Sequence, residues 1–348
     1  MEDYLNIITA SLKKHLVFPD EAIAHGFNQI LDEESFQELE YDDASNNIGS
    51  ISAIDGGSNT IIKTPTSALV FNRVYCNKFV KMSKLKEYEL CTFASFTEIV
   101  EEDGKSFFKT SIYPLKGNCS MEPIKIKMDE YKIGKLKGDL DRALSVARRF
   151  AEWDFIEKAL DTGSEFVLMD GALQTAFAEE SHKASRLYKQ AVSKGAMVVG
   201  LSKSNTIYTD ENCIPIAGFL DSMAERKKFT KWYIKLGNSE EWAHEANVFY
   251  IRLHEGADRA FRLDVFEGAD EMTVKKLLIA LQANSKYFAF PGFPYALIDA
   301  HIYANVKDEE VKHIKDLILD KLDLEDVKKL ERMERALMSH DVLDMLGG

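Results

Sequence analysis

Two apolar runs, each ending in Asp-Gly, constrain the fold of this chain more than any other feature. "ISAIDGGSNT" (51–60) places Asp55 after the first run, and "FVLMDGAL" (166–173) places Asp170 after the second. Consecutive apolar residues are typical of strands buried on both faces, in the middle of a sheet. Taken alone, each Asp-Gly pair is more typical of a turn than of a ligand site. Because there are two, we predict neighbouring central strands whose ends present both aspartates to one crevice.

The rest of the sequence predicts one α/β domain built on a mixed sheet. Helical spacing of apolar residues predicts one or two helices in residues 1–35 and helices at 128–160, 173–194, 272–281 and beyond 307. Residues 51–115 are rich in short β-like runs, which belong to the same sheet or to a small inserted barrel. Further strands are expected at 165–169, at 196–203 and in a hairpin over 246–266.

Composition limits the class of protein. The 348 residues carry 57 acidic and 44 basic side chains, a net charge of −13, whereas proteins that coat nucleic acid are normally basic. A local basic channel to a confined site is still compatible with this balance. No apolar run approaches the roughly 20 residues of a membrane span, and the acidic start is unlike a secretory signal. We therefore expect a soluble, cytoplasmic protein.

The four cysteines are far apart and form no CxxC pair. This spacing argues against a disulfide framework or a cysteine zinc site and fits a reducing compartment. The chain also lacks the GxxxxGK[ST] pattern of a P-loop, so any work that needs ATP would fall to a separate motor.

Two aspartates held close together need a counter-charge, because both cannot ionise cheaply. A divalent cation supplies it, and oxygen ligands favour Mg²⁺ or Mn²⁺ over zinc. Two such ions ~4 Å apart can hydrolyse a phosphodiester. A third candidate is His301 in "FPYALIDAH" (293–301), where a helix would turn Asp299 toward solvent and His301 toward the crevice. From this stretch alone, a histidine satisfied by hydrogen bonds is the better interpretation.

The ordered trio "AIDGGS", "VLMDGAL" and "FPYALIDAH" resembles the NurA nuclease family over roughly residues 51–304. The resemblance implies an RNase H-like core with a β-rich insertion and helical N- and C-terminal extensions. It also implies a manganese-dependent nuclease with 5′-to-3′ exonuclease and single-strand endonuclease activities on DNA. Family members act in DNA end resection as homodimers with the hexameric translocase HerA, which implies a nucleoid-associated protein.

The resemblance assigns roles to individual residues. Asp55 and Asp170 match the motif aspartates, and His301 matches the motif histidine. The family's helix glutamate falls on Glu152 in "ARRFAEWDFIEKAL" (147–160), ahead of Asp154 and Glu157. By this resemblance, Asp55, Glu152 and Asp170 would hold two Mn²⁺ or Mg²⁺ ions, and His301 would either ligate the second ion or contact the scissile phosphate. A surface ion pair with Arg148 or Arg149 would equally explain Glu152.

Less specific candidates surround this set. Tyr295 stands nearest to a tyrosine that the family uses upstream of the histidine, although its alignment is imperfect. Lys203 and Arg73 are candidate phosphate contacts, and Phe293 or Tyr295 could stack on an unpaired base. Surface charges and core packing are equally good interpretations of these residues.

Two other functions compete with a nuclease. "IDGGSNT" resembles the phosphate loop of the ATP-dependent phosphotransferases related to actin, Hsp70 and sugar kinases, and of their exopolyphosphatase relatives; "MDGALQT" lacks the glycine that their second loop needs. A catalytically inactive scaffold that loads a translocase is the other alternative. The three acidic candidates speak against a scaffold, and assays with DNA, ATP and polyphosphate separate all three functions.

Overall fold

The structure is a computed structural model, and it describes most of the chain. The described residues are 2–15, 17–39, 48–86, 88–117, 119, 121–129, 132–133, 136–137, 139–203, 207–211, 213–239 and 245–336. Among them, no helix is both long enough and apolar enough to cross a membrane.

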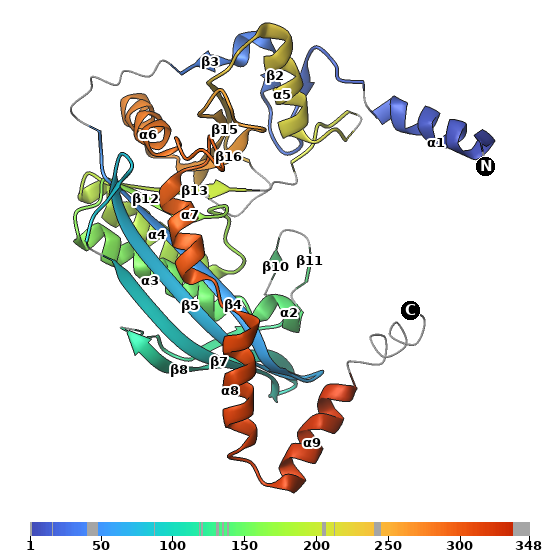
Figure 1. Cartoon of the computed structure of the whole chain (residues 1–348), viewed down its shortest axis with the longest axis vertical. Helices are drawn as coiled ribbons and strands as arrows, with labels where there is room; N and C mark the ends of the chain where they lie inside the picture. The colour runs from blue at the N-terminus through green and yellow to red at the C-terminus, as the bar shows by residue number, and fades with distance from the viewer. Residues whose placement is uncertain are drawn as a thin grey trace.

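One large sheet of twelve strands dominates the described part of the chain (Figure 1). From edge to edge it contains β3 (Gln37–Glu38), β14 (Trp232–Gly237), β15 (Ala246–Arg252), β16 (Phe261–Phe266), β13 (Met197–Ser202), β12 (Phe166–Asp170), β4 (Ile51–Lys63), β5 (Ser67–Val80), β7 (Glu89–Glu102), β8 (Lys105–Gly117) and β9 (Ile124–Lys127), with β6 (Ser83–Lys84) paired to β5. The predicted β-rich segment therefore extends the main sheet and does not form a separate barrel.

The centre of the sheet is parallel and its two wings are antiparallel. β12 runs parallel to both β4 and β13, and the other pairings in the sheet are antiparallel. Phe166 to Met169 of β12 and the whole of β13 are buried, as expected for strands covered on both faces. β15 and β16 form the predicted hairpin. The prediction of a mixed sheet flanked by helices is confirmed.

Helices cover both faces of the central strands. α3 (Val146–Asp161) and α4 (Ala178–Ser193) pack on one face against alternate residues of the strands, among them Ile54, Val167 and Met169. α6 (Glu271–Asn284) and α7 (Tyr295–Ala304) pack on the opposite face, over the other alternate residues. Because successive strand side chains alternate between faces, residues 53 and 55 share the α7 face with residues 166, 168 and 170.

The N-terminal region differs from its prediction. α1 (Glu2–His15) is a helix as expected, and its apolar side chains are exposed. Residues 22–31, expected to be helical, instead form the short strands β1 (Ala22–Ile23) and β2 (Ile30–Leu31), followed by the 3₁₀ helix η1 (Glu33–Ser35). Phe27 and Leu31 pack there against α5 (Ile216–Lys227), so tertiary burial overrides a weak helical pattern.

The predicted helix at 128–160 is also shorter than expected. Its first part contains β10 (Lys132–Ile133), β11 (Leu136–Lys137) and α2 (Leu140–Ala143). Asp139 caps α2 by accepting a hydrogen bond from the Arg142 amide at 3.0 Å. Beyond residue 307, the described residues form α8 (Asp308–Leu319) and α9 (Leu324–Arg335), which confirms the helices predicted there.

Cys91 and Cys119 form a disulfide. The sequence spacing gave no sign of this bond because it links residues on either side of the β7–β8 hairpin. The strand register pairs Cys91 with Gly117, two residues before Cys119. Cys76 and Cys213 are free.

Candidate active site

Strand register brings the two motif aspartates together. Met169 of β12 lies beside Ile54 of β4, so the next residues along these parallel strands are Asp170 and Asp55. Both side chains project from the α7 face. Asp55 is 6% exposed and lies in the interior of β4, whereas Asp170 ends β12. The predicted convergence of these carboxylates across more than a hundred residues is present in the structure.

His301 reaches the same point from α7. Its Nδ1 lies 2.8 Å from Oδ2 of Asp55, and its side chain is 61% exposed. Three possible ligand atoms, one from each of Asp55, Asp170 and His301, all lie within 4.8 Å of one another. Two carboxylate oxygens and an imidazole nitrogen form a donor set suited to Mn²⁺ or another divalent cation. The three residues therefore fit a metal centre.

The raised pKa of Asp55 also favours a cation site. Burial raises the pKa of Asp55 to about 6, and the nearby carboxylates of Asp170 and Glu152 add to the rise, against opposing contributions from His301 and Lys203. An ionised Asp55 is thus unfavourable unless positive charge is brought to it. Since only the ionised carboxylate ligates a metal, the capacity of this site for a cation increases as the pH rises through about 6.

Lys203 stands at the edge of the site. It follows β13, the parallel neighbour of β12, and its Nζ lies 2.6 Å from Oδ2 of Asp170. The same ammonium lies 5.7 Å from the ring centre of Phe293. Lys203 is 36% exposed in its side chain, so it is reachable from solvent. The sequence nominated Lys203 as a phosphate contact, and in the structure its ammonium group contacts the carboxylate of Asp170.

Glu152 lies near Asp55, on the face of the sheet that α3 covers. It belongs to α3, is 4% exposed, and its Oε1 lies 2.6 Å from Nη1 of Arg148. A Cβ atom added to Gly56 would be only 2.3 Å from this Oε1, which shows how closely the carboxylate approaches β4. Glu152 is buried rather than on the surface, but it is outside the 4.8 Å group formed by Asp55, Asp170 and His301.

The second glycine of "DGG" lets α7 lie directly on the sheet. A Cβ atom added to Gly57 would be 2.1 Å from the carbonyl oxygen of Ala304, the last residue of α7. The two glycines therefore have separate functions: Gly56 makes room for Glu152 on one face, and Gly57 makes room for the helix that carries His301 on the other.

A buried polar network also fixes α7. Asn77 of β5 donates from Nδ2 to the Ala296 carbonyl and to Asp299 Oδ2, both at 2.8 Å. Lys84 Nζ lies 2.7 Å from the same Asp299 oxygen. Asp299 is only 8% exposed, so the prediction that it faces solvent is wrong. The sequence gave no signal for Asn77 or Lys84, since their roles arise from a contact across more than two hundred residues.

Two of the weaker sequence candidates, Arg73 and Phe293, have structural contacts instead. Arg73 donates to the Asn305 carbonyl at 2.7 Å and pairs with Glu310, which holds α8 against the sheet and lowers the pKa of Glu310. Phe293 is fully buried, with its ring edge-on to Phe261 at 5.1 Å, which agrees with core packing, one of its two sequence interpretations, and leaves no ring surface for a base. Arg73 thus anchors α8 through polar contacts, and Phe293 belongs to the core.

Tyr295 begins α7, six residues before His301. Its ring packs against Phe79 and Tyr287, at centroid distances of 5.8 and 4.9 Å. These contacts give Tyr295 a packing role at the start of the helix, and it does not join the aspartates and His301.

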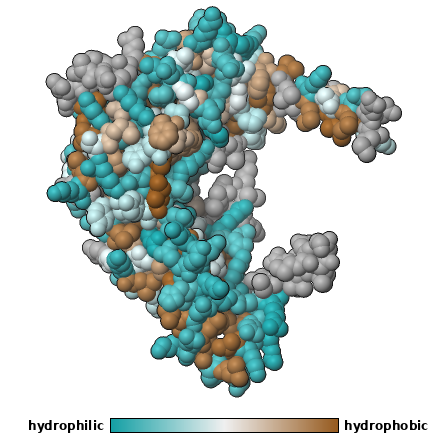
Figure 2. All heavy atoms as spheres, viewed as in Figure 1, coloured by the Kyte–Doolittle hydropathy of each residue, from teal (hydrophilic) through white to brown (hydrophobic). Residues whose placement is uncertain are grey.

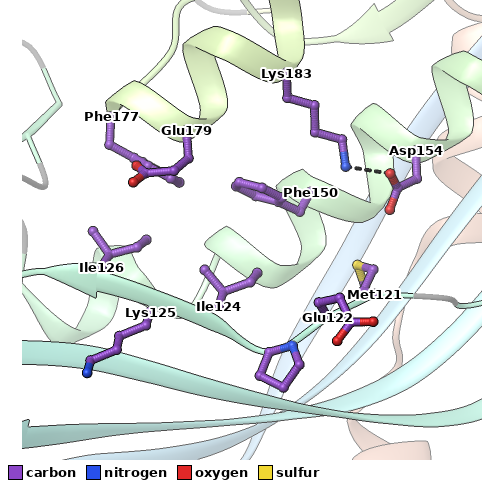
Figure 3. Close-up of a pocket in the computed structure, with 11 residues that line it drawn as sticks. Met121, Glu122, Ile124, Lys125, Ile126, Phe150, Asp154, Phe177, Glu179 and Lys183 are labelled. Carbon is purple, nitrogen blue, oxygen red and sulfur yellow. Dashed lines mark hydrogen bonds and ion pairs between the residues drawn. The ribbon is translucent and has the colours of Figure 1, made fainter.

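Asp154 and Glu157, the weaker alternatives to Glu152, are engaged elsewhere. Asp154 faces a cavity of about 460 Å³ between β9, α3 and α4, where it pairs with Lys183 (Figure 3). Phe150 and Phe177 stack at 5.7 Å in the same cavity. Glu157 pairs with Arg186 at 3.1 Å. Glu152 is also paired, with Arg148, and differs from these two residues in that its carboxylate lies against Gly56, next to Asp55.

The family model for the NurA domain matches residues 49–306, nearly three quarters of the chain. The chain belongs to the NurA family. A comparison with curated proteins finds no match.

Among solved structures, the chain resembles the NurA nuclease from Sulfolobus solfataricus, at 15% identity and a TM-score of 0.53, over 92% of this chain and 94% of that one. At this identity the similarity shows a shared fold. The catalytic domain of human endonuclease V matches with 13% identity and a TM-score of 0.39, over 91% and 98% of the two chains. Aquifex aeolicus Argonaute follows, with 10% identity and a TM-score of 0.28, over 75% and 28%.

Proposed function

We propose that this protein is a metal-dependent nuclease that hydrolyses phosphodiester bonds of DNA, as a 5′-to-3′ exonuclease and a single-strand endonuclease. The observation that carries the proposal is the meeting of Asp55, Asp170 and His301 at the centre of the sheet. Membership of the NurA family and the fold shared with the Sulfolobus NurA nuclease support it.

Asp55 and Asp170 are the proposed ligands of Mn²⁺ or Mg²⁺, with His301 beside them and Glu152 as a third carboxylate. Glu152 is included because its oxygen lies against Gly56, the residue after Asp55. A bound divalent cation lowers the pKa of water and neutralises charge on the phosphodiester, and a pair of ions can stabilise both the attacking and the leaving oxygen. The number of carboxylates is suited to such a pair.

The protein's own side chains set the geometry around that chemistry. His301 is exposed on one side and hydrogen-bonded to Asp55 on the other, so it faces the direction from which a phosphate arrives. Lys203 offsets the charge of Asp170 and offers an ammonium group to an incoming phosphate. The buried network of Asn77, Asp299 and Lys84 keeps α7, and with it His301, in place.

We also propose that the protein acts as a homodimer with a HerA-type hexameric translocase during DNA end resection, associated with the nucleoid. The surface of α1 supports an interface of this kind. Tyr4, Leu5, Ile8 and Leu12 are each more than half exposed on this helix, which projects from the rest of the molecule (Figures 1 and 2). Exposed apolar side chains gathered on one element are typical of protein contacts.

The phosphotransferase alternative loses its main support. A phosphate loop requires the backbone to turn at "IDGGSNT", but β4 continues as a strand from Ile51 to Lys63. This segment therefore resembles an ATP-binding loop in its amino-acid sequence but not in its backbone conformation.

A cleavage assay tests the proposed function. Labelled single-stranded DNA should be degraded with Mn²⁺, with little degradation when EDTA replaces the metal. Cleavage should increase as the pH is raised from about 5 to about 8, because Asp55 ionises across its pKa of about 6. Hydrolysis of ATP or polyphosphate in parallel, with intact DNA, would instead favour a phosphotransferase or exopolyphosphatase, and no activity on any substrate would favour a scaffold.

A further inference from the structure

A group of tyrosines lies next to the proposed metal centre. In the antiparallel pairing of β4 and β5, Tyr75 lies directly opposite Asp55. Residues opposite each other in such a pair project from the same face, with Cβ atoms about 5 Å apart. Tyr75 therefore adjoins Asp55 on the face that carries His301.

Two exposed tyrosines cover this buried one. Tyr75 is 3% exposed, and the ring of Tyr303 stacks on it at a centroid distance of 5.0 Å with an interplanar angle of 25°. Tyr88, just before β7, lies 5.9 Å from the Tyr75 ring. Tyr303 and Tyr88 are 53% and 62% exposed. Two large aromatic rings thus rest on a third and present much of their surface to solvent.

Lys84 fixes the arrangement. Its ammonium lies 4.5 Å from the centre of the Tyr303 ring and 5.4 Å from that of Tyr75. The salt bridge from Lys84 to the buried Asp299 holds the lysine in place. Lys84 also brings a positive charge to the edge of the aromatic surface, where a phosphate backbone would pass.

The aromatic surface and the metal centre are physically joined. α7 contributes both His301, which contacts Asp55, and Tyr303, which stacks on Tyr75. Asp55 and Tyr75 are in turn neighbours across β4 and β5. A nucleotide whose phosphate reached Asp55 would consequently have its base, or that of an adjacent nucleotide, within reach of these rings.

We propose that Tyr88 and Tyr303, supported by Tyr75, form a stacking surface that binds an unpaired base beside the scissile phosphate. This inference rests on the proposed nuclease function. Such a stacking surface selects single-stranded substrates, because the bases in a duplex have both faces covered by their neighbours. Stacking on aromatic side chains tolerates any base, so the surface positions the strand without reading its sequence.

Binding of a short oligothymidylate, measured by fluorescence anisotropy in EDTA to prevent cleavage, tests this proposal. Tyr88→Ala and Tyr303→Ala should each weaken binding about tenfold, within the range known for base stacking on aromatic residues. Tyr88→Trp and Tyr303→Phe retain an aromatic ring and should bind nearly as tightly as the wild type. Tyr113→Ala is the matched control, since Tyr113 is a similarly exposed tyrosine (52%) on β8.

An abasic oligonucleotide of equal length supplies the second arm. Wild type and both alanine variants should bind it with equal, weaker affinity, because it has no bases to stack. Unchanged affinity of Tyr88→Ala and Tyr303→Ala for oligothymidylate overturns the proposal, as does an equal loss in Tyr113→Ala. If binding depends on the tyrosines but no DNA is cleaved with Mn²⁺, the nuclease proposal fails and the stacking surface stands.

Discussion

Asp55→Asn should abolish metal-dependent DNA cleavage while leaving the fold intact. The amide keeps the size of the carboxyl group but removes the negative charge that the cation needs. Loss of residues that merely support a ligand costs 10–100-fold in affinity or activity, so loss of a ligand should cost about a hundredfold or more. Without metal, the melting temperature should not fall, because burial makes the ionised carboxylate of Asp55 unfavourable in the folded protein.

Asp154→Asn is the matched control for this experiment. Asp154 is an acidic residue on α3 that pairs with Lys183 in the separate cavity of Figure 3. The control should cleave DNA at close to the wild-type rate. Wild-type cleavage by Asp55→Asn, measured with labelled single-stranded DNA and Mn²⁺, would remove Asp55 from the proposed site.

Gly57→Ala should damage both stability and cleavage. The added Cβ would be 2.1 Å from the Ala304 carbonyl oxygen, so the end of α7 must move away from β4. Overpacking of this kind typically lowers the free energy of unfolding by about 1–3 kcal/mol. Because α7 carries His301, cleavage should also fall, by about a hundredfold if the displacement approaches 1 Å. Urea denaturation and the cleavage assay measure the two effects.

Gly218→Ala is the control substitution of the same chemistry. A Cβ at Gly218, in α5, would have its nearest neighbour at an ordinary 4.0 Å, in Phe18. Alanine in a helix interior is favoured over glycine, so stability should be unchanged or slightly raised. If Gly57→Ala proved as stable and as active as Gly218→Ala, the close approach of α7 to β4 would not be a requirement of the site.

The central strands were predictable from sequence because strands buried on both faces have runs of apolar residues. The run before Asp170 is apolar at four consecutive positions, the run before Asp55 is interrupted only by Ser52, and the structure makes the two strands parallel neighbours. The backbone at the two Asp-Gly pairs was not equally predictable. Gly171 does turn, with φ of 105°, whereas Gly56 and Gly57 continue a strand. Gly56 and Gly57 allow α3 and α7 to pack closely on the two faces of β4. This packing depends on distant helices, so the sequence around the glycines does not indicate it.

The surroundings of the site depend on contacts that sequence patterns do not encode. Phe293 is an aromatic residue near a motif, and only its burial shows that it belongs to the core. Arg73 is a cation on a strand near the motif, and only the position of Glu310 shows that it anchors α8. Conversely, no sequence pattern indicates that Tyr75 lies beside Asp55, because the register of β4 and β5 sets that position.

The proposed function depends on the binding of one cation by Asp55 and Asp170 together. A crystal of the protein soaked in Mn²⁺, with data collected to show the anomalous signal of manganese, tests it directly. We expect a peak within bonding distance of both carboxylates and next to His301. Manganese bound elsewhere in an active enzyme, with no peak between these two aspartates, would contradict it.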